Sequence, residues 1–388
     1  MFTLNLQGMQ TILRQCVGID IAKSSFTSCI SQQLSSGEIK LSAPAEFENC
    51  RHGFNQFLKW VRKNADASPK ATFVMEATGI YYESLAYHLH QLKESVCVVL
   101  PNKVKHYAKS LNTKSKTDEI DARVIAQMGA ERALELWTPP AEVFRSLRAL
   151  TRLYTDLKVE KTVFVNRLHS MEAAHEPLPF IVKSTKELVR KLDCEIEKTE
   201  KEIEKLISSD QWLKQKVERL LTIKGVGFIT IAIVLAETQG FKLITNLKQL
   251  ASYAGYDVVQ RESGSSIKGK TRISKKGNSR IRAAMHFPAL VGCRHNPEFK
   301  ATYERINAGK SSKMVAATAL QRKILGLIYT LWKNNDVYRP KLKMTSSAHQ
   351  NNECEDNETT AIKKAGKPKS PPAQDELLTV QQTEALLH

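Results

Sequence analysis

The chain has 388 residues, with 58 Lys and Arg against 40 Asp and Glu, so its formal net charge at pH 7 is +18. That balance favours a partner rich in negative charge and excludes an acidic, solvating chain. The seven cysteines are scattered and form no C-x-x-C pair, which argues against a disulfide framework and a structural zinc site. The first residues lack the apolar core of a signal peptide, and even the apolar run at 231–236 is too short to span a bilayer.

Short β-branched runs alternate with helical stretches up to about Trp137, which predicts an α/β region. We expect a strand hairpin at 16–21 and 25–30, a buried strand at 72–76, another strand at 96–100, and helices at 53–64 and 80–93. Pro139 and Pro140 close this region, because consecutive prolines cannot continue a helix. The first expected domain is therefore 1–140.

Residues 141–219 carry two apolar stripes at helical spacing. The first stripe is Leu150, Leu153, Leu157, Phe164, Leu168 and Met171, and the second is Leu188, Leu192, Ile196, Ile203 and Leu206. Pro177 and Pro179 mark a turn between them. An antiparallel helical hairpin fits this pattern, and an intermolecular coiled coil is the alternative.

Residues 220–340 predict a mainly helical domain that is interrupted by glycine-rich, basic loops. This segment holds 20 Lys and Arg against 6 Asp and Glu, which is most of the net charge of the chain. Phosphate contacts dominate nucleic-acid affinity, so the segment is the expected phosphate-binding part. From 341 to 388 the sequence is polar without apolar periodicity, and we expect a disordered tail.

Four carboxylates in the N-terminal region have the placement that a divalent metal site needs. Asp20 lies at the end of the first expected strand, Glu76 ends a later strand, and Asp118 and Asp121 share one face of a helix because they are three residues apart. Together they match a ribonuclease H-like topology and could hold two Mg²⁺ ions roughly 4 Å apart, with Mn²⁺ as the alternative ion. Each acid alone also fits a turn or helix-cap residue.

A glycine-containing turn follows at Lys224, Gly225, Val226 and Gly227, between two expected helices. This is the pattern of a helix-hairpin-helix, in which glycines let backbone amides at a helix N-terminus approach a phosphate. An ordinary helix turn is the alternative.

The segment QRESGSSIKGKTRISKKGNSRIR combines a serine with many cations. Ser263 lies between Glu262 and Gly264, and Ser265 and Ser266 are alternatives in the same loop. A serine that attacks a phosphodiester needs nearby positive charge to stabilise the transition state. The same residues also fit a basic loop that grips phosphates, with serine as a hydrogen-bond donor. The cations are Arg261, Lys268, Lys270, Arg272, Lys275, Lys276 and Arg280.

The phrases VGIDIAKSS, MEATGIYYESLAYHL, PNKVKHYAKSLNTKSKTDEIDARVIA, IKGVGFITIAIVLAE, LASYAGYDVVQRESGSSIKGKTRISKKGNSRIR and PALVGCRHNP occur in this order between about Val17 and Trp332. Together they resemble the IS-one-ten family of insertion-sequence transposases, also called DEDD transposases. The resemblance implies a RuvC-like nuclease domain, a coiled coil and a C-terminal transposase domain.

By the same resemblance, Asp20, Glu76, Asp118 and Asp121 would bind Mg²⁺, and Ser263 would become covalently linked to cleaved DNA. The expected partners are double-stranded donor and target DNA, a structured guide RNA encoded by the element, and further copies of the chain in a dimer or tetramer. We expect a cytoplasmic, nucleoid-associated protein that binds no membrane.

Two other functions remain open at this point. A RuvC-like Holliday-junction resolvase or other metal-dependent nuclease would use only the four acids and would keep cutting DNA without Ser263. A non-enzymatic nucleic-acid-binding protein would use the acids as caps, and replacing Asp118 or Asp121 by asparagine would then leave every activity intact.

Overall fold

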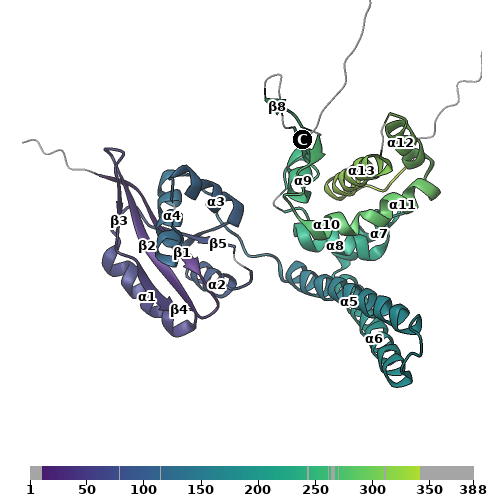
Figure 1. Cartoon of the computed structure of the whole chain (residues 1–388). Helices are drawn as coiled ribbons and strands as arrows, with labels where there is room; N and C mark the ends of the chain where they lie inside the picture. The colour runs from purple at the N-terminus through teal and green to yellow at the C-terminus, as the bar shows by residue number, and fades with distance from the viewer. Residues whose placement is uncertain are drawn as a thin grey trace, which may run out of the picture. The chain divides into compact units, whose positions relative to one another are not determined.

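A computed structural model describes residues 11–77, 79–113, 115–242, 244–260, 262–263, 267–269, 271–309 and 312–340 (Figure 1). For residues 262, 263, 267 and 268 it describes the backbone alone. The expected tail at 341–388 lies outside these residues, as do Arg261, Lys270, Ser265 and Ser266.

The N-terminal part is a mixed sheet with helices, which confirms the predicted α/β region. Its strands are β1 (Ile12–Ile21), β2 (Ser25–Leu34), β3 (Ile39–Leu41), β4 (Ala45–Glu48), β5 (Thr72–Glu76) and β6 (Ser95–Val99). The strand order is β3-β2-β1-β5-β6, and β4 also pairs with β2. The first strands run antiparallel to one another, whereas β1, β5 and β6 are parallel.

Alternation along β1 sends side chains to two different cores. Val17, Ile19 and Ile21 join one apolar cluster, with aromatic residues of α1 (Arg51–Asn64) and apolar residues of α2 (Glu83–Gln91). Cys16 belongs to another cluster, which includes Val124, Ile125 and Met128 of α4 (Asp118–Glu131) and residues of α3 (Pro101–Ser110). The sheet is therefore covered on both faces.

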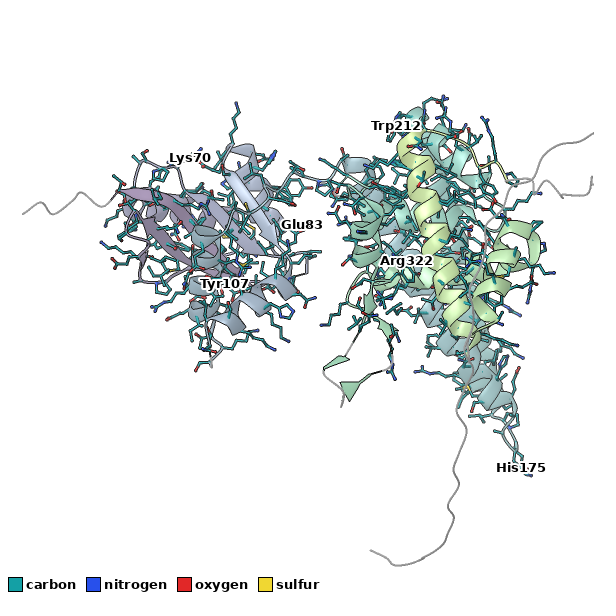
Figure 2. The ribbon with its side chains drawn as sticks, turned by 90° about the horizontal axis from the view of Figure 1, so that it is seen from above. Lys70, Glu83, Tyr107, His175, Trp212 and Arg322 are labelled. Carbon is teal, nitrogen blue, oxygen red and sulfur yellow. The ribbon has the colours of Figure 1, made fainter. Side chains whose placement is uncertain are left out.

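The predicted helical hairpin is present as α5 (Glu142–Glu172) and α6 (Pro179–Ser209). The two helices pack against each other and run antiparallel, because Glu172 pairs with Lys186 near the turn and Lys161 pairs with Asp193 further away. His175 lies in the turn (Figure 2). An intermolecular coiled coil stays a prediction.

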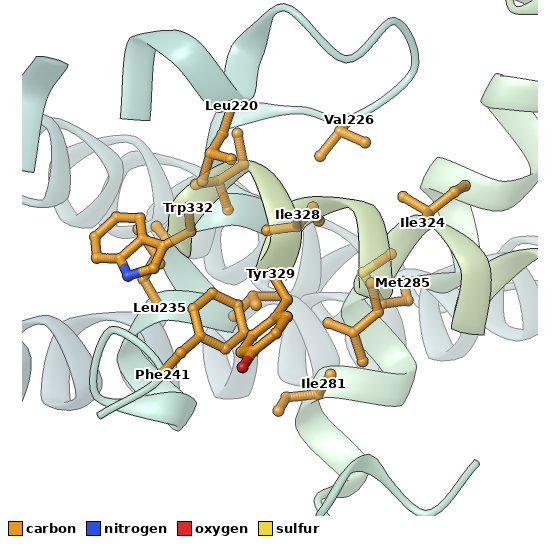
Figure 3. Close-up of a cluster of buried hydrophobic side chains, with 14 of the residues drawn as sticks. Leu220, Val226, Leu235, Phe241, Ile281, Met285, Ile324, Ile328, Tyr329 and Trp332 are labelled. Carbon is orange, nitrogen blue, oxygen red and sulfur yellow. The ribbon is translucent and has the colours of Figure 1, made fainter. Parts of the chain in front are cut away.

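The remaining described residues are mainly helical, as predicted. The helices are α7 (Gln211–Leu221), α8 (Phe228–Thr238), α9 (Leu247–Ala254), α10 (Ser279–Ala284), α11 (His286–His295), α12 (Pro297–Asn307) and α13 (Lys313–Asn334). Buried residues from α7 to α13 form one core, of which Leu220, Leu235, Phe241, Ile281 and Trp332 are labelled members (Figure 3). Phe144 and Leu147 of α5 belong to the same core, so the base of the hairpin is anchored in it.

Two short ladders interrupt these helices, where the sequence predicts only a loop. Strand β7 (Val258–Val259) pairs with β10 (Arg272–Ile273), and β8 (Glu262–Ser263) pairs with β9 (Ile267–Lys268), both antiparallel. We call residues 258–273 the serine arm. Within the described ranges, no helix is both long and apolar enough to cross a bilayer.

Candidate active site

Asp20 and Glu76 lie at neighbouring strand ends on one face of the sheet. Strands β1 and β5 are parallel, with Ile19 opposite Met75, so the residue after each is adjacent to the other. Alternation places Asp20 on the same face as Cys16, whose cluster includes α4. Glu76 shares that face, because it is two residues after Val74 in the same cluster.

Helix α4 contacts β1 directly, because glycine lies at the points where the two elements meet. A Cβ at Gly18 would lie 2.1 Å from the backbone nitrogen of Ala126, and a Cβ at Gly129 would lie 2.2 Å from the sulfur of Cys16. Position 129 thus contacts position 16, and position 126 contacts position 18, so the helix runs antiparallel to the strand. The first turn of α4 therefore lies near the end of β1, where Asp20 is.

That first turn carries the other two acids, and another residue caps it. Thr117 is the N-cap, and its hydroxyl accepts a hydrogen bond from the amide of Ile120 at 3.3 Å. Asp118 and Asp121 are therefore not needed as side-chain caps, although their negative charge still suits the helix N-terminus. Asp118 is exposed and Asp121 is partly exposed, so the face is open to solvent.

The four acids interact electrostatically. The pKa of Asp20 is raised to about 6, first by burial and then by the charges of Asp121, Asp118 and Glu76, in that order of size, while Lys116 lowers it. Burial also raises the pKa of Asp121, whereas Lys116 lowers it. Mutual repulsion of this kind is what a bound cation relieves.

As the side chains stand, no three His, Cys, Asp or Glu residues in the described part of the chain converge tightly enough to hold an ion. The donor chemistry nevertheless fits a hard divalent cation, because all four groups are carboxylates on one face and three of them raise the pKa of the fourth. Lys116 lies beside them, with its ammonium 3.8 Å from the Asp121 carboxylate. Sequence reasoning missed Lys116, although it is two residues before Asp118.

The predicted helix-hairpin-helix lies between α7 and α8. Gly225 has a φ of +98°, and a Cβ there would be 2.8 Å from the Cα of Gly292 in α11, so this position needs glycine. Gly227 begins α8 as an N-cap without a side-chain cap, and a Cβ there would meet open space. Lys224 is exposed beside it. The amide of Val226 donates to the carbonyl of Ile223 at 3.0 Å, so the part of this turn open to a phosphate is the exposed start of α8 at Gly227.

The serine arm places Ser263 in β8, opposite Ile267. Arg272 lies in β10, and Lys275 and Lys276 follow it, all three exposed. Arg280, also predicted to contact nucleic acid, has a guanidinium 3.1 Å from the Asp156 carboxylate of α5, so its charge is shared with an acid.

Comparison with known proteins decides the family. A family model described as a DEDD transposase of the IS110 type matches residues 17–172. A second, described as the transposase IS116/IS110/IS902 family, matches residues 217–304. The chain belongs to the IS110 family of transposases. An IS110 transposase acts on DNA, which it cleaves and recombines.

Curated relatives of this IS110 transposase cover most of its length. The pilin gene-inverting proteins of Moraxella bovis and Moraxella lacunata are each 28% identical over 321 residues, covering 82% of this chain and 96% of theirs. The transposase for insertion sequence element IS1328 from Yersinia enterocolitica is 25% identical, covering 69% of this chain and 80% of its own.

Among solved structures, an Aquifex aeolicus member of the Ppx/GppA family is 10% identical and covers 84% of this chain and 92% of its own. Its TM-score is 0.20, which is too low to inform the fold.

Proposed function

We propose that the protein cuts and rejoins donor and target DNA through a covalent phosphoserine intermediate. Four acids (Asp20, Glu76, Asp118 and Asp121) would hold two Mg²⁺ ions, or Mn²⁺ in their place, and Ser263 would be the nucleophile. The observation that carries the proposal is the placement of the four acids, with Asp20 and Glu76 at adjacent strand ends and Asp118 and Asp121 in the first turn of the helix that packs on β1. Family membership supports DNA as the substrate.

The chemistry balances without an external energy source. The hydroxyl oxygen of Ser263 loses its proton to a base and attacks the phosphorus, and the bond from phosphorus to the leaving sugar oxygen breaks as that oxygen takes up a proton. When bound, the metal ions stabilise the charge that develops on the phosphate oxygens. A hydroxyl of a second strand then attacks the phosphoserine and releases the serine. The phosphodiester count is conserved, so ligation needs no ATP.

The N-terminal domain fits a RuvC-like, ribonuclease H-like fold. Its antiparallel β1 and β2 lead into parallel β5 and β6, and the two strand-end acids meet a helix that carries the other two. We propose domains at 1–140 for the nuclease part, 141–219 for the hairpin, 220–340 for the serine-bearing part and 341–388 for the tail. Coiled-coil pairing of the hairpin would support a dimer or tetramer.

A guide RNA encoded by the element would select both DNA partners by base pairing. The protein would then need contacts to phosphates more than contacts to bases. The 20 Lys and Arg within 221–340 supply such contacts. The same break-and-join reaction also serves inversion, in which two sites on one DNA exchange strands, and this is the activity that the names of the two Moraxella relatives describe.

The test uses the full chain with the RNA that co-purifies from cells carrying the complete element, and a plasmid that bears the element's ends. Denaturing gels measure strand cleavage and covalent protein–DNA adduct. Wild type should form the adduct with Mg²⁺ and not in EDTA, and Ser263→Ala should form none while still binding DNA. Cutting that survives Ser263→Ala would favour the resolvase alternative. Unchanged activity in EDTA would refute the metal site.

A further inference from the structure

A buried carboxylate in the helical core joins three elements at the base of the serine arm. Glu237, near the end of α8, is only 3% exposed. Its two carboxylate oxygens accept hydrogen bonds from Arg152 of α5 at 2.8 and 3.1 Å, and one of them also accepts from the Asn278 amide at 2.7 Å. Burial by itself would raise the pKa of Glu237, but these two donors lower it, so the carboxylate is held ionised.

Asn278 links this carboxylate to the end of the arm. Its side-chain oxygen accepts from the amides of Arg280 and Ile281 at 3.0 and 3.1 Å and so caps α10. Its backbone amide donates to the carbonyl of Tyr253 in α9 at 2.7 Å. Asn278 therefore connects Glu237 and the start of α10 through its side chain, and α9 through its backbone, just five residues after β10 ends.

The residues between β10 and Asn278 pack against the C-terminal end of α9 and the residues that follow it. The amides of Ser274 and Lys275 donate to the carbonyls of Asp257 and Gly255 at 2.8 and 3.1 Å. A Cβ at Gly277 would lie 2.4 Å from the backbone nitrogen of Gly255. These contacts leave little room, so we expect a displacement of Asn278 to be transmitted to β10 and its partner β7.

Helix α5 is the third element. Besides Arg152, it contributes Asp156, which pairs with Arg280 at 3.1 Å, and Arg148, whose Nε donates to the carbonyl of Ala236 at 3.4 Å. These contacts fasten the first helix of the hairpin to the end of α8 and the start of α10. A bidentate arginine to a buried carboxylate fixes direction as well as distance.

We propose that Glu237 is a positioning residue, which through Asn278 and Arg152 holds the base of the serine arm against helix α5. We call Glu237, Asn278 and Arg152 together the node. The inference rests on the proposed function, because it assigns the node to positioning of the Ser263 hydroxyl. Sequence reasoning missed it, although a lone acid that ends the apolar run IAIVLAE is an available signal. A misplacement of about 1 Å at a reacting atom costs up to about a hundredfold in rate.

Asn278→Ser separates the node from the helix cap. A serine hydroxyl still caps α10, but the amide that reaches Glu237 is gone. Asn246→Ser is the matched control, because Asn246 caps α9 by accepting from the Gln249 amide at 2.9 Å and is exposed. Both full-length variants, with co-purified RNA and the same plasmid, are compared for DNA bound, for the rate of covalent adduct and for hydrogen exchange of the amides in β7 and β10.

We expect Asn278→Ser to form adduct about tenfold more slowly than Asn246→Ser at equal bound DNA, with faster exchange in β7 and β10. Rates within about twofold of each other would overturn the proposal. If Asn278→Ser does not fold, Arg152→Lys is tested in its place. The Arg152 side chain is 44% exposed, and lysine keeps the positive charge but cannot make the two parallel hydrogen bonds to Glu237. A slower adduct rate in folded Arg152→Lys supports the node, and an unchanged rate overturns it.

Ser263→Ala distinguishes failure of the proposed function from failure of the positioning role alone. If it leaves adduct formation intact, or if wild type forms none, the proposed function fails and the positioning role with it. If Ser263→Ala abolishes the adduct while Asn278→Ser matches its control, only the positioning role fails.

Discussion

Replacing Asp20 by asparagine should stabilise the metal-free protein at neutral and alkaline pH. The carboxyl of Asp20 has its pKa raised on folding from 3.8 to about 6, by burial and then by three neighbouring acids. Below the lower value the group is protonated in both states and costs nothing, and above the upper value it is ionised in both and the full cost is present. Asparagine resembles the protonated form, so the gain should appear between these two values and stay constant above them.

The size follows from the shift. A rise from 3.8 to about 6 corresponds to about 3 kcal/mol at about 1.4 kcal/mol per pH unit. Asp20 is only partly buried, so solvent screening reduces this to about 1–2 kcal/mol. For the proposed domain at 1–140, that difference in the free energy of unfolding raises the melting temperature by about 2–8 °C.

The assay is thermal unfolding of the full chain in EDTA at about pH 4 and about pH 8, with hydrogen exchange of β1 to identify the transition of the sheet. Glu119→Gln is the control, because Glu119 is an exposed acid in the same turn. Mg²⁺ should then stabilise wild type more than Asp20→Asn. An Asp20→Asn protein that is less stable than wild type at about pH 8 in EDTA would refute the mutual repulsion of the acids.

Three further substitutions test the packing that supports the sites. Gly18→Ala should destabilise the protein by about 2 kcal/mol or more, because its Cβ would lie 2.1 Å from a backbone nitrogen of α4; Gly309→Ala, whose Cβ meets open space, should leave the urea midpoint unchanged. In the same urea unfolding measurement, Gly225→Ala should cost about 1–3 kcal/mol because of its positive φ, and Gly227→Ala only a few tenths. Arg152→Met should lower the free energy of unfolding by about 3–5 kcal/mol, since it leaves the buried Glu237 carboxylate without its cation and with only the Asn278 amide as a donor. Because the pKa of that carboxyl is lowered, the cost should shrink as the pH falls below 4.5.

The sequence predicts the buried strand β5 correctly but underestimates the lengths of β1 and β2. An apolar run such as Thr72–Glu76 carries its own signal, because both faces are covered. Strand β1 begins at Ile12, before the predicted start, and includes Gln15, which is 1% exposed. The Gln15 amide donates to the carbonyls of Asp66 and Pro69 at 3.0 and 3.2 Å. Partners more than fifty residues away cannot be read from a local pattern.

Helix α2 shows the same limit at a helix start. The apolar spacing predicts a helix from 80 onward, whereas α2 begins at Glu83. Gly79 has a φ of +58°, and the residues after it form a turn in which Ile80 is 68% exposed. Gly79 indicates a turn at this point, but the apolar periodicity placed the start of the helix directly after it, three residues too early.

For the candidate site, spacing predicted the shared face of Asp118 and Asp121 and the strand-end position of Glu76. It could not predict how close α4 comes to β1, because the contact at Gly18 depends on the direction in which the helix crosses the sheet. The serine arm was predicted as a loop, since strands of two residues have no periodicity. The node at Glu237 was missed because its two partners, Arg152 and Asn278, lie 85 and 41 residues away along the chain.

The contact of α4 with β1 places the four acids on one face of the sheet and the aromatic core on the other. Main-chain atoms meet there, with Gly18 on one side and Ala126 on the other, so rotamer changes cannot alter the height of the helix. The aromatic cluster around Phe26 and Phe57 fills the opposite face. Substitutions of those aromatic residues should therefore change the stability of the sheet before they change the distance between α4 and β1.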